Sequence, residues 1–200
     1  MHSRFAAGAL SLFLLAAGAL SAQAQVLGDT DGRYSGGQLS TKRYEFFGGM
    51  SYVGAIRRET VPAPGKYAPG TIIVNTSERR LYLIQDNGTA LKYGIGVGRV
   101  GFTWAGVTSV VAKKEWPDWT PPSQMLRRRP DLPRFMKGGP ENPLGARAMY
   151  LGASLYRIHG SNEPETIGQA VSSGCFRLMN DDVIDLYNRV RVGAKVIVMR

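Results

Sequence analysis

The chain has little of the residue types that most often carry metal and redox chemistry. It contains one cysteine and two histidines in 200 residues, and one of the histidines, His2, stands at the amino terminus. A single cysteine excludes an internal disulfide framework and any CxxC metal or redox site. One cysteine and one further histidine make no zinc site without carboxylates that the sequence does not place. We therefore expect neither a metal nor a cofactor.

Acidic residues are scarce as well. Asp and Glu number 15 against 25 Lys and Arg, which leaves a formal net charge of +10. Such a balance suits an anionic partner and decides nothing about the fold. Hydrophobic residues make up 44% and charged residues 20%, which is typical of a globular domain that buries its own core. The 25 glycines and 11 prolines favour turns and short strands over long helices.

The amino terminus has the pattern of an export signal. Arg4 precedes an apolar run from Phe5 to Leu20, and residues 22–24 (Ala-Gln-Ala) form a small-x-small cleavage site. The alternative is a membrane anchor, but a bilayer span needs roughly 20 apolar residues and this run is shorter. We expect residues 1–24 to be a signal peptide cleaved after Ala24. The mature chain would then lie in the periplasm or cell envelope, with no stable membrane span and no nucleic acid as partner.

The mature chain divides into two parts. Residues 25–66 are rich in glycine and show no sustained hydrophobic period, so they predict a flexible arm that ends in a linker from Pro62 to Gly65. From residue 67 onward, short apolar runs alternate with turn signals, the strongest of which is the hairpin sequence Asp86-Asn87-Gly88. These runs predict strands at residues 71–75, 81–85, 91–97, 106–112, 146–151, 155–159 and 195–199.

Two further segments break the series of strands. Residues 113–140 hold six of the eleven prolines together with Trp116 and Trp119. A segment of this kind inside a compact domain is typical of a lid over a site, and a disordered basic surface loop is the alternative. Near the carboxyl end, Asn180 is expected to cap a helix whose buried stripe begins at Val183 and repeats with helical spacing.

The one cysteine of the chain lies in surroundings that favour a nucleophile. Cys175 follows Gly174 and precedes Arg177 by two residues, which predicts a turn that exposes the sulfur beside positive charge and lowers the pKa of the thiol. An exported protein with an unpaired thiol also risks oxidation, which weighs against the alternative of a buried structural cysteine.

The second histidine, His159, is the obvious base for this thiol. It ends an apolar strand, and no other side chain of the mature region titrates near neutrality. A thiol is only slightly ionised at neutral pH, so a nucleophilic cysteine needs a base within hydrogen-bond reach. The imidazole could be oriented by the backbone carbonyl of Gly160 or Ser161, or by the side-chain amide of Asn162.

The stretches around these two residues resemble the L,D-transpeptidase catalytic domain, the YkuD family. The resemblance rests on His159-Gly160-Ser161-Asn162-Glu163-Pro164, on Ile167-Gly168 and on Ser172-Ser173-Gly174-Cys175-Phe176-Arg177-Leu178. Residues 68–74, 80–83 and 142–147 add to it, so that it covers residues 67–200. The family's fold is mainly β, a β-sandwich or barrel-like arrangement with one or two short helices, and we expect that fold here.

The resemblance also implies roles for individual residues. Cys175 is the expected nucleophile and His159 its general base. Backbone N–H groups around Gly174 and Cys175 would form an oxyanion hole, with Ser173 and Gly160 as supporting residues. Arg177 would grip a carboxylate of the peptide substrate, and the other expected substrate contacts are Ser161 and Asn162. Two positions depart from the pattern, Ser173 in place of a frequent histidine and Phe176 in place of an aliphatic residue, and these put substrate choice in question.

The implied reaction is acyl transfer on peptidoglycan stem peptides. The cysteine would form a thioester from a tetrapeptide stem with loss of D-alanine, and an amine would then take the acyl group. The acceptor would be a second stem, which gives a 3–3 cross-link, or an envelope protein. Water as acceptor would instead make the chain an L,D-carboxypeptidase or amidase. A non-catalytic envelope-binding module is the other alternative, and a papain-like protease is disfavoured because its cysteine precedes its histidine.

Overall fold

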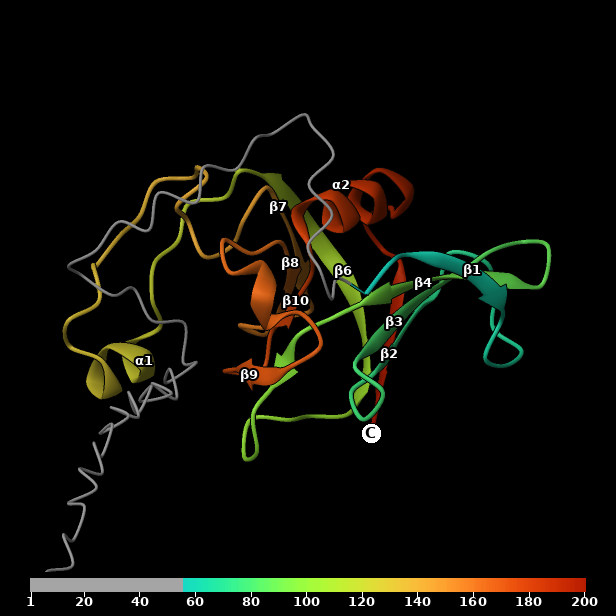
Figure 1. Cartoon of the computed structure of the whole chain (residues 1–200), viewed down its shortest axis with the longest axis horizontal. Coiled ribbons are helices and arrows are strands. Elements are labelled where there is room, and N and C mark those ends of the chain that lie inside the picture. The colour runs from blue at the N-terminus through green and yellow to red at the C-terminus, as the bar shows by residue number, and fades with distance from the viewer. Residues whose placement is uncertain (1–55) are drawn as a thin grey trace, which may run out of the picture.

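The computed structural model of the chain describes residues 56–200, and strands predominate in it (Figure 1). The helices are α1 (Ser123–Arg128), the short 3₁₀ helix η1 (Pro164–Thr166) and α2 (Asn180–Arg189). The strands are β1 (Glu59–Pro62), β2 (Ile72–Asn75), β3 (Arg80–Ile84), β4 (Thr89–Gly94), β5 (Val97–Gly98), β6 (Gly106–Glu115), β7 (Arg147–Leu151), β8 (Arg157–His159), β9 (Ala170–Ser172), β10 (Phe176–Arg177) and β11 (Lys195–Met199). None of the helices within residues 56–200 is both long and apolar enough to cross a membrane. The predicted signal peptide and most of the predicted arm lie outside the described residues.

One long strand joins two halves of the main sheet. Nine strands follow the order β1-β4-β3-β2-β11-β6-β7-β8-β10, and β5 pairs separately with β9. Residues 106–109 of β6 pair with β11, whereas residues 110–115 pair with β7. The register shifts between Val110 and Ala112, and a bulge of this kind bends a strand and increases its twist. In Figure 1 the β1–β4 end and the β8–β10 end accordingly lie on different sides of β6.

The two halves share one hydrophobic core. Fully buried side chains from β2, β3 and β4 form a single cluster with those from β7, β8 and β10, and the buried face of α2 completes it. Burying such side chains is the main favourable contribution to folding. The prediction of a mainly β, sandwich-like fold with one or two short helices is confirmed. The largest members of the cluster with no exposed surface are Ile72, Leu81, Tyr93, Ile95, Met149, Leu151, Ile158, Leu178 and Leu186.

Each predicted strand has a counterpart, but residues 95–96 divide the predicted strand 91–97 into β4 and β5, and residues 155–156 lie outside β8. Two predicted irregular segments are wrong at their edges. Residues 59–62, assigned to the flexible arm, form β1, which pairs antiparallel with β4. Thr60 and Val61 are β-branched and suit a strand, and the free edge of β4 supplies the partner. Just before β1, Arg58 forms ion pairs with Asp182 and Asp185 of α2 at 3.2 and 3.3 Å. Residues 113–115, assigned to the lid, continue β6.

Helix α2 follows its predicted stripe but not its predicted cap. Val183, Leu186 and Val190 are buried, as the spacing predicts. Asn180, however, is the first helical residue and makes no capping bond with the helix, whose N-cap position is Met179. The Oδ1 atom of Asn180 instead accepts a hydrogen bond from the N–H of Ala146 at 2.9 Å. The long-range contact outcompetes the local one because residues 145–146 run directly beside the start of α2.

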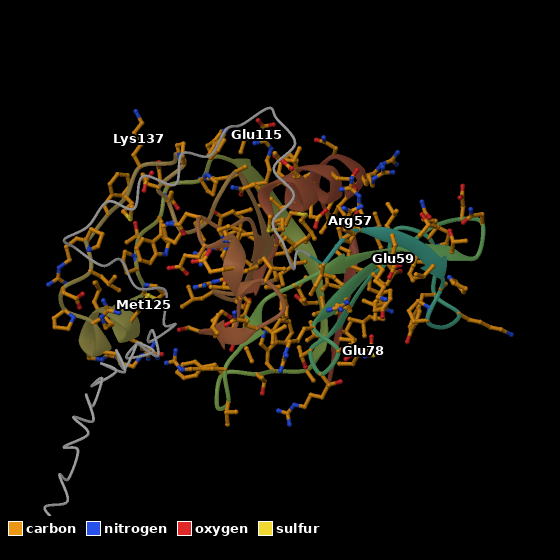
Figure 2. All side chains as sticks on the ribbon, viewed as in Figure 1. Arg57, Glu59, Glu78, Glu115, Met125 and Lys137 are labelled. Carbon is orange, nitrogen blue, oxygen red and sulfur yellow. The ribbon has the colours of Figure 1, made fainter. Side chains whose placement is uncertain are left out.

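The proline-rich loop that follows β6 is packed rather than disordered. Trp119, Leu132 and Leu144 form a small hydrophobic cluster of their own, against which Met125 of α1 packs. The backbones of Trp119 and Met136 exchange two hydrogen bonds of 2.8 Å. Figure 1 shows this loop with α1 as a separate lobe beside the β8–β10 end of the sheet, and Figure 2 places Met125 and Lys137 at opposite ends of that lobe.

Candidate active site

Four polar side chains gather on one face of the parallel pair β8–β10. In this pair His159 is the register partner of Arg177, and Ile158 is that of Phe176. Side chains alternate between the two faces of a strand, and Ile158 and Phe176 point into the core. The opposite face therefore carries the side chains that flank them, and these line a common cavity. They are Arg157, His159, Cys175 and Arg177.

His159 is held in a defined tautomer by its own neighbour. The Nδ1 atom lies 2.6 Å from the carbonyl oxygen of Gly160, and since a carbonyl only accepts, Nδ1 must carry the hydrogen. The lone pair is then on Nε2, which is free to accept a proton. Burial and the nearby Arg177 guanidinium lower the pKa of His159 to about 3, so the ring is neutral at physiological pH. Of the three predicted orienting groups, the structure provides the Gly160 carbonyl.

Two glycines let the backbone approach closely enough to hold this histidine. A Cβ atom on Gly160 or on Gly145 would collide with the Oδ1 atom of Asn180. Gly145 also has a φ of +62°, a backbone conformation that residues other than glycine rarely adopt. The Asn180 side chain bonds Ala146 across this crossing. The strand end that carries His159 is thus fixed to the start of α2.

Gly174 forms the turn that presents the cysteine. Its φ is +109°, and a Cβ atom there would lie 2.5 Å from the Tyr156 ring. The Tyr156 ring stacks on Trp104 with centroids 4.8 Å apart, and the Trp104 Nε1–H donates to the Gly174 carbonyl at 3.2 Å. Only glycine fits this position, because any side chain meets both the strained angle and the ring. The turn is therefore clamped between an aromatic stack and the start of β10.

The thiol of Cys175 is half-buried and protonated in this state. Its Sγ–H points to the Leu155 carbonyl oxygen at 3.7 Å. Burial raises the pKa of the Cys175 thiol, and the Arg157 and Arg177 guanidiniums oppose that rise. The sequence-based prediction of a lowered thiol pKa is therefore wrong for the resting state. The positive charge is present as expected, but the burial of the sulfur in the cavity wall outweighs it.

Arg177 is already paired inside the protein. Its Nη1 atom lies 3.0 Å from Oε2 of Glu163, and the arginine side chain is almost fully buried. Burial raises the pKa of Glu163, while the charge of Arg177 opposes that rise. The Nε atom of Arg177 is buried with no hydrogen-bond partner among residues 56–200. To bind a substrate carboxylate as predicted, Arg177 would have to release Glu163. In the structure Arg177 is a buried cation next to His159, and its charge lowers the pKa of that histidine.

The backbone around the cysteine offers one free donor. The Gly174 N–H donates to Ser172 Oγ at 3.1 Å, and that hydroxyl donates to the Cys175 carbonyl at 2.6 Å. Within residues 56–200 the Cys175 N–H has no hydrogen-bond partner. Ser173 lines the cavity, and its buried Oγ also lacks a partner in the described part of the chain. Of the predicted oxyanion donors, the Cys175 N–H is thus the available one.

The cavity beside these groups has a volume of about 330 Å³. Residues of the proline-rich loop form one wall of the cavity, among them Trp119, Pro122, Met125 and Arg128. Trp116 does not line the cavity; its N–H donates to the Ala146 carbonyl at 2.8 Å instead. The cavity wall includes three arginines and, among the described residues, no aspartate or glutamate.

Two predicted substrate contacts lie away from the cavity. Ser161 is buried, and its Oγ accepts a hydrogen bond from the Glu163 N–H at 2.9 Å. Asn162 donates through Nδ2 to the Glu141 carbonyl at 3.0 Å. Neither residue lines the cavity. Their hydrogen bonds instead stabilise the conformation of the loop that follows His159. Among residues 56–200 no group of His, Cys, Asp or Glu side chains is arranged to hold a metal ion.

Sequence reasoning missed several residues that line or support the site. Arg157 could have been placed there by strand alternation, because it stands two residues before His159 on the same strand. Tyr156 directly precedes Arg157, but no pattern predicts that its ring packs against Gly174. Phe102, Trp104 and Arg128 come from distant segments, and no local pattern predicts their place at the site.

Comparison with known proteins gives a consistent family match. Residues 69–198 match the family model YkuD, the L,D-transpeptidase catalytic domain. A probable L,D-transpeptidase of Escherichia coli K12, ErfK/SrfK, is 43% identical over 134 residues, which cover 62% of this chain and 42% of that protein. The putative L,D-transpeptidase YqjB of Bacillus subtilis is 34% identical over 133 residues, 64% of this chain and 69% of that one. The chain thus spans less than half of the E. coli relative.

Solved structures share the fold at lower identity. An L,D-transpeptidase from Mycobacterium smegmatis is 20% identical with a TM-score of 0.53, over 65% of this chain and 58% of that one. L,D-transpeptidase 3 from Mycobacterium tuberculosis is 16% identical with a TM-score of 0.53, over 65% of this chain and 60% of that one. At these identities the likeness shows the fold.

Proposed function

The chain belongs to the YkuD family of L,D-transpeptidase catalytic domains, and on that premise we propose that it is a peptidoglycan L,D-transpeptidase with Cys175 as its nucleophile. The observation that carries the proposal is that Cys175 and His159 line the same cavity. His159 ends β8, and Cys175 directly precedes β10, the strand that pairs with β8. A nucleophile, a neutral base in a fixed tautomer and a free backbone donor meet there. This set of groups suits acyl transfer through a thioester.

The first step forms the acyl-enzyme. Nε2 of His159 takes the thiol proton, and the Cys175 sulfur attacks the carbonyl carbon of the L,D peptide bond before the terminal D-alanine. The Cys175 N–H donates to the oxygen that becomes negative in the tetrahedral intermediate. The bond from carbon to nitrogen then breaks, the imidazolium returns its proton to the departing amine, and D-alanine leaves. The product is a thioester between Cys175 and the shortened stem.

The second step returns the enzyme to its resting state. An amine of the acceptor attacks the thioester carbonyl, and neutral His159 accepts a proton from that amine. The carbon–sulfur bond breaks, and the imidazolium protonates the leaving sulfur. If the amine belongs to a second stem the product is a 3–3 cross-link, and if it belongs to an envelope protein the product is an anchored protein.

Water competes with the amine for the thioester. Hydrolysis would make the enzyme an L,D-carboxypeptidase or amidase, with the same first step. We propose that the proline-rich loop acts as a lid that favours the transferase, because Trp119 and neighbouring apolar side chains line the same cavity as Cys175 and would limit the access of water.

We place this reaction in the cell envelope. The expected signal peptide and its cleavage site after Ala24 support export, and the net charge of +10 suits an anionic wall polymer. N-terminal sequencing of the protein recovered from periplasm tests the first point. A chain that begins at Gln25 is expected, and a chain that keeps residues 1–24 and stays in the cytoplasm would contradict it.

The decisive assay incubates the chain lacking residues 1–24 with purified tetrapeptide muropeptides and identifies the products by mass. Transpeptidation gives dimers that have lost one alanine, and hydrolysis gives tripeptides. Cys175→Ala is expected to abolish both products while its circular dichroism stays native. Cys175→Ala with full turnover would refute the nucleophile, and a wild type that binds muropeptides without product would favour the non-catalytic binding module.

A further inference from the structure

The three arginines that line the cavity have different partners. Arg177 is ion-paired with Glu163. Arg157 lies beside the cysteine turn, where its Nη1 donates to the same Leu155 carbonyl as the thiol, at 3.1 Å. Within residues 56–200 the Arg128 guanidinium makes no ion pair and no hydrogen bond, with side chain or backbone. All of its donors are therefore free for a ligand.

Arg128 is exposed, but an aromatic ring lies against it. Its guanidinium carbon lies 5.1 Å from the centroid of the Phe102 ring, which also lines the cavity. Stacking of this kind uses the face of the guanidinium and leaves its N–H groups free at the edge. Those edge donors match the two oxygens of a carboxylate. Arg128 is thus oriented by an aromatic ring without being neutralised.

A second guanidinium increases the positive charge at this point. Arg99 stands over the same Phe102 ring at 4.3 Å. Burial and the charge of Arg128 both lower the pKa of Arg99, which shows that the two cations repel each other. The cavity wall holds no aspartate or glutamate within residues 56–200, so an anion bound at Arg128 would meet no like charge there.

We infer that Arg128, positioned by Phe102, forms a carboxylate-binding subsite in the part of the cavity wall that the proline-rich loop supplies. The nearby Arg99 adds a second positive charge. The inference rests on the proposed function for the identity of the ligand, which is a peptide stem that carries a free carboxylate. That carboxylate can come from the acyl donor or from the amine acceptor. The subsite would select for charged stems and against amidated ones.

Arg128 could also stabilise α1 without binding any ligand. Arg127 and Arg128 both lie in the last turn of α1, where positive side chains favourably oppose the helix dipole. Arg127 is exposed and does not line the cavity, so Arg127→Gln is the matched control. Both substitutions remove one charge from the same helix end, and only Arg128→Gln removes the proposed subsite.

The test compares stems whose carboxylates are free or amidated. For Arg128→Gln we expect KM to rise about tenfold or more with the fully charged stems, because a charge-assisted pair is lost, while kcat stays close to wild type. When the carboxylate that Arg128 binds is amidated, the KM values of wild type and Arg128→Gln should become equal. Whether that carboxylate belongs to the acyl donor or to the amine acceptor then shows which of the two Arg128 binds. Arg127→Gln should behave as wild type.

A binding measurement keeps the test independent of turnover. Calorimetric titration of the same stems into Cys175→Ala, with and without Arg128→Gln, should show the same loss of affinity. If the wild type turns over no stem but this loss is present, the subsite stands and the transpeptidase proposal fails. Equal affinities for Arg128→Gln and Arg127→Gln, in a Cys175→Ala background, would overturn the subsite whatever the activity.

Discussion

His159 and Arg177 are register partners across the parallel pair β8–β10, so the candidate base has a buried cation as its cross-strand neighbour. The Arg177 charge and burial together lower the pKa of His159 to about 3. The imidazole is therefore neutral, with the lone pair of Nε2 unprotonated, throughout the physiological range. Glu163 pairs with Arg177 and makes no hydrogen bond to the imidazole among the described residues.

This relationship predicts a pH dependence of folding. The folded pKa of His159 lies below its ordinary value of 6.5, so the unfolded chain binds more protons between these values. Stability contributed by the neutral ring is present above pH 6.5 and is lost as the pH falls, by about 1.4 kcal/mol per unit. Burial raises the pKa of Asp182 to about 6, and that group acts in the opposite direction. The measurement is therefore the difference in unfolding free energy between wild type and His159→Gln, by denaturant titration from pH 7 to 4.5. A difference that does not change with pH would contradict the buried neutral ring.

Removal of the base should be compensated by alkali. In His159→Ala the thiol must ionise without help, and its pKa is raised by burial. We expect the rate of acylation by a tetrapeptide stem to fall strongly at pH 7 and to recover in large part as the pH rises toward 10. Stopped-flow or quenched mass measurements of the acyl-enzyme follow this directly. A rate that is low and independent of pH would assign His159 a purely structural role.

Arg157 should stabilise the thiolate. The guanidinium shares the Leu155 carbonyl with the thiol and lowers the pKa of Cys175 against the effect of burial. In Arg157→Gln the pH profile of thiol alkylation should move upward by about one unit, a tenfold slower reaction at neutral pH. Arg157→Lys should restore part of the shift. Arg127→Gln, which removes an exposed charge, is the control, and an unchanged profile in Arg157→Gln would refute this role.

Gly174 should tolerate no side chain. Gly174→Ala combines a φ of +109° with a Cβ atom 2.5 Å from the Tyr156 ring. A cost of roughly 1–3 kcal/mol in unfolding free energy is expected from the backbone strain alone, together with loss of acylation. Gly139→Ala, at a position with open space around it, should change neither property. Thermal unfolding and acylation of the two variants would decide, and a Gly174→Ala enzyme with normal turnover would show that the turn does not position the sulfur.

The lid should control the choice between amine and water. Trp119→Ala opens the cavity wall and is expected to raise the ratio of hydrolysis to transfer, whereas Trp116→Ala should leave the ratio unchanged. Leu132 belongs to the same hydrophobic cluster but does not line the cavity. Leu132→Ala therefore shows how much of the effect comes from weaker packing of the loop rather than from the loss of a side chain in the cavity wall. Product ratios by mass spectrometry provide the comparison. If Trp119→Ala and Trp116→Ala give equal ratios, the loop does not exclude water.

Much of the fold could be predicted because its signals are local. The apolar runs at residues 72–75 and 195–199 are too short for helices and become β2 and β11, and the stripe from Val183 is buried as spacing requires. The edge strand β1 escaped prediction because its pairing depends on β4, about thirty residues away. Asn180 was misassigned for the same reason, since its partner Ala146 belongs to another segment.

The site shows the same division. Cys175 and His159 follow from one stretch of sequence and its resemblance to a family, and the structure brings both to one cavity. The sequence left three candidates for the group that orients His159, and the structure shows the Gly160 carbonyl in that place. The state of the thiol could not be predicted, because its burial depends on residues from several segments that form the cavity wall around it. The pairing of Arg177 with Glu163 and the position of Arg128 over Phe102 likewise exist only in three dimensions.

The most direct test of Cys175 as an acyl-forming nucleophile is intact-protein mass spectrometry after exposure to a carbapenem. Its strained ring supplies an acyl group, and the Cys175 N–H would stabilise the tetrahedral species. We predict one stable adduct, which maps to the peptide that contains Cys175 and is absent in Cys175→Ala and after prior alkylation of the thiol. An adduct on a serine, or no adduct on a protein shown to be folded, would contradict the account.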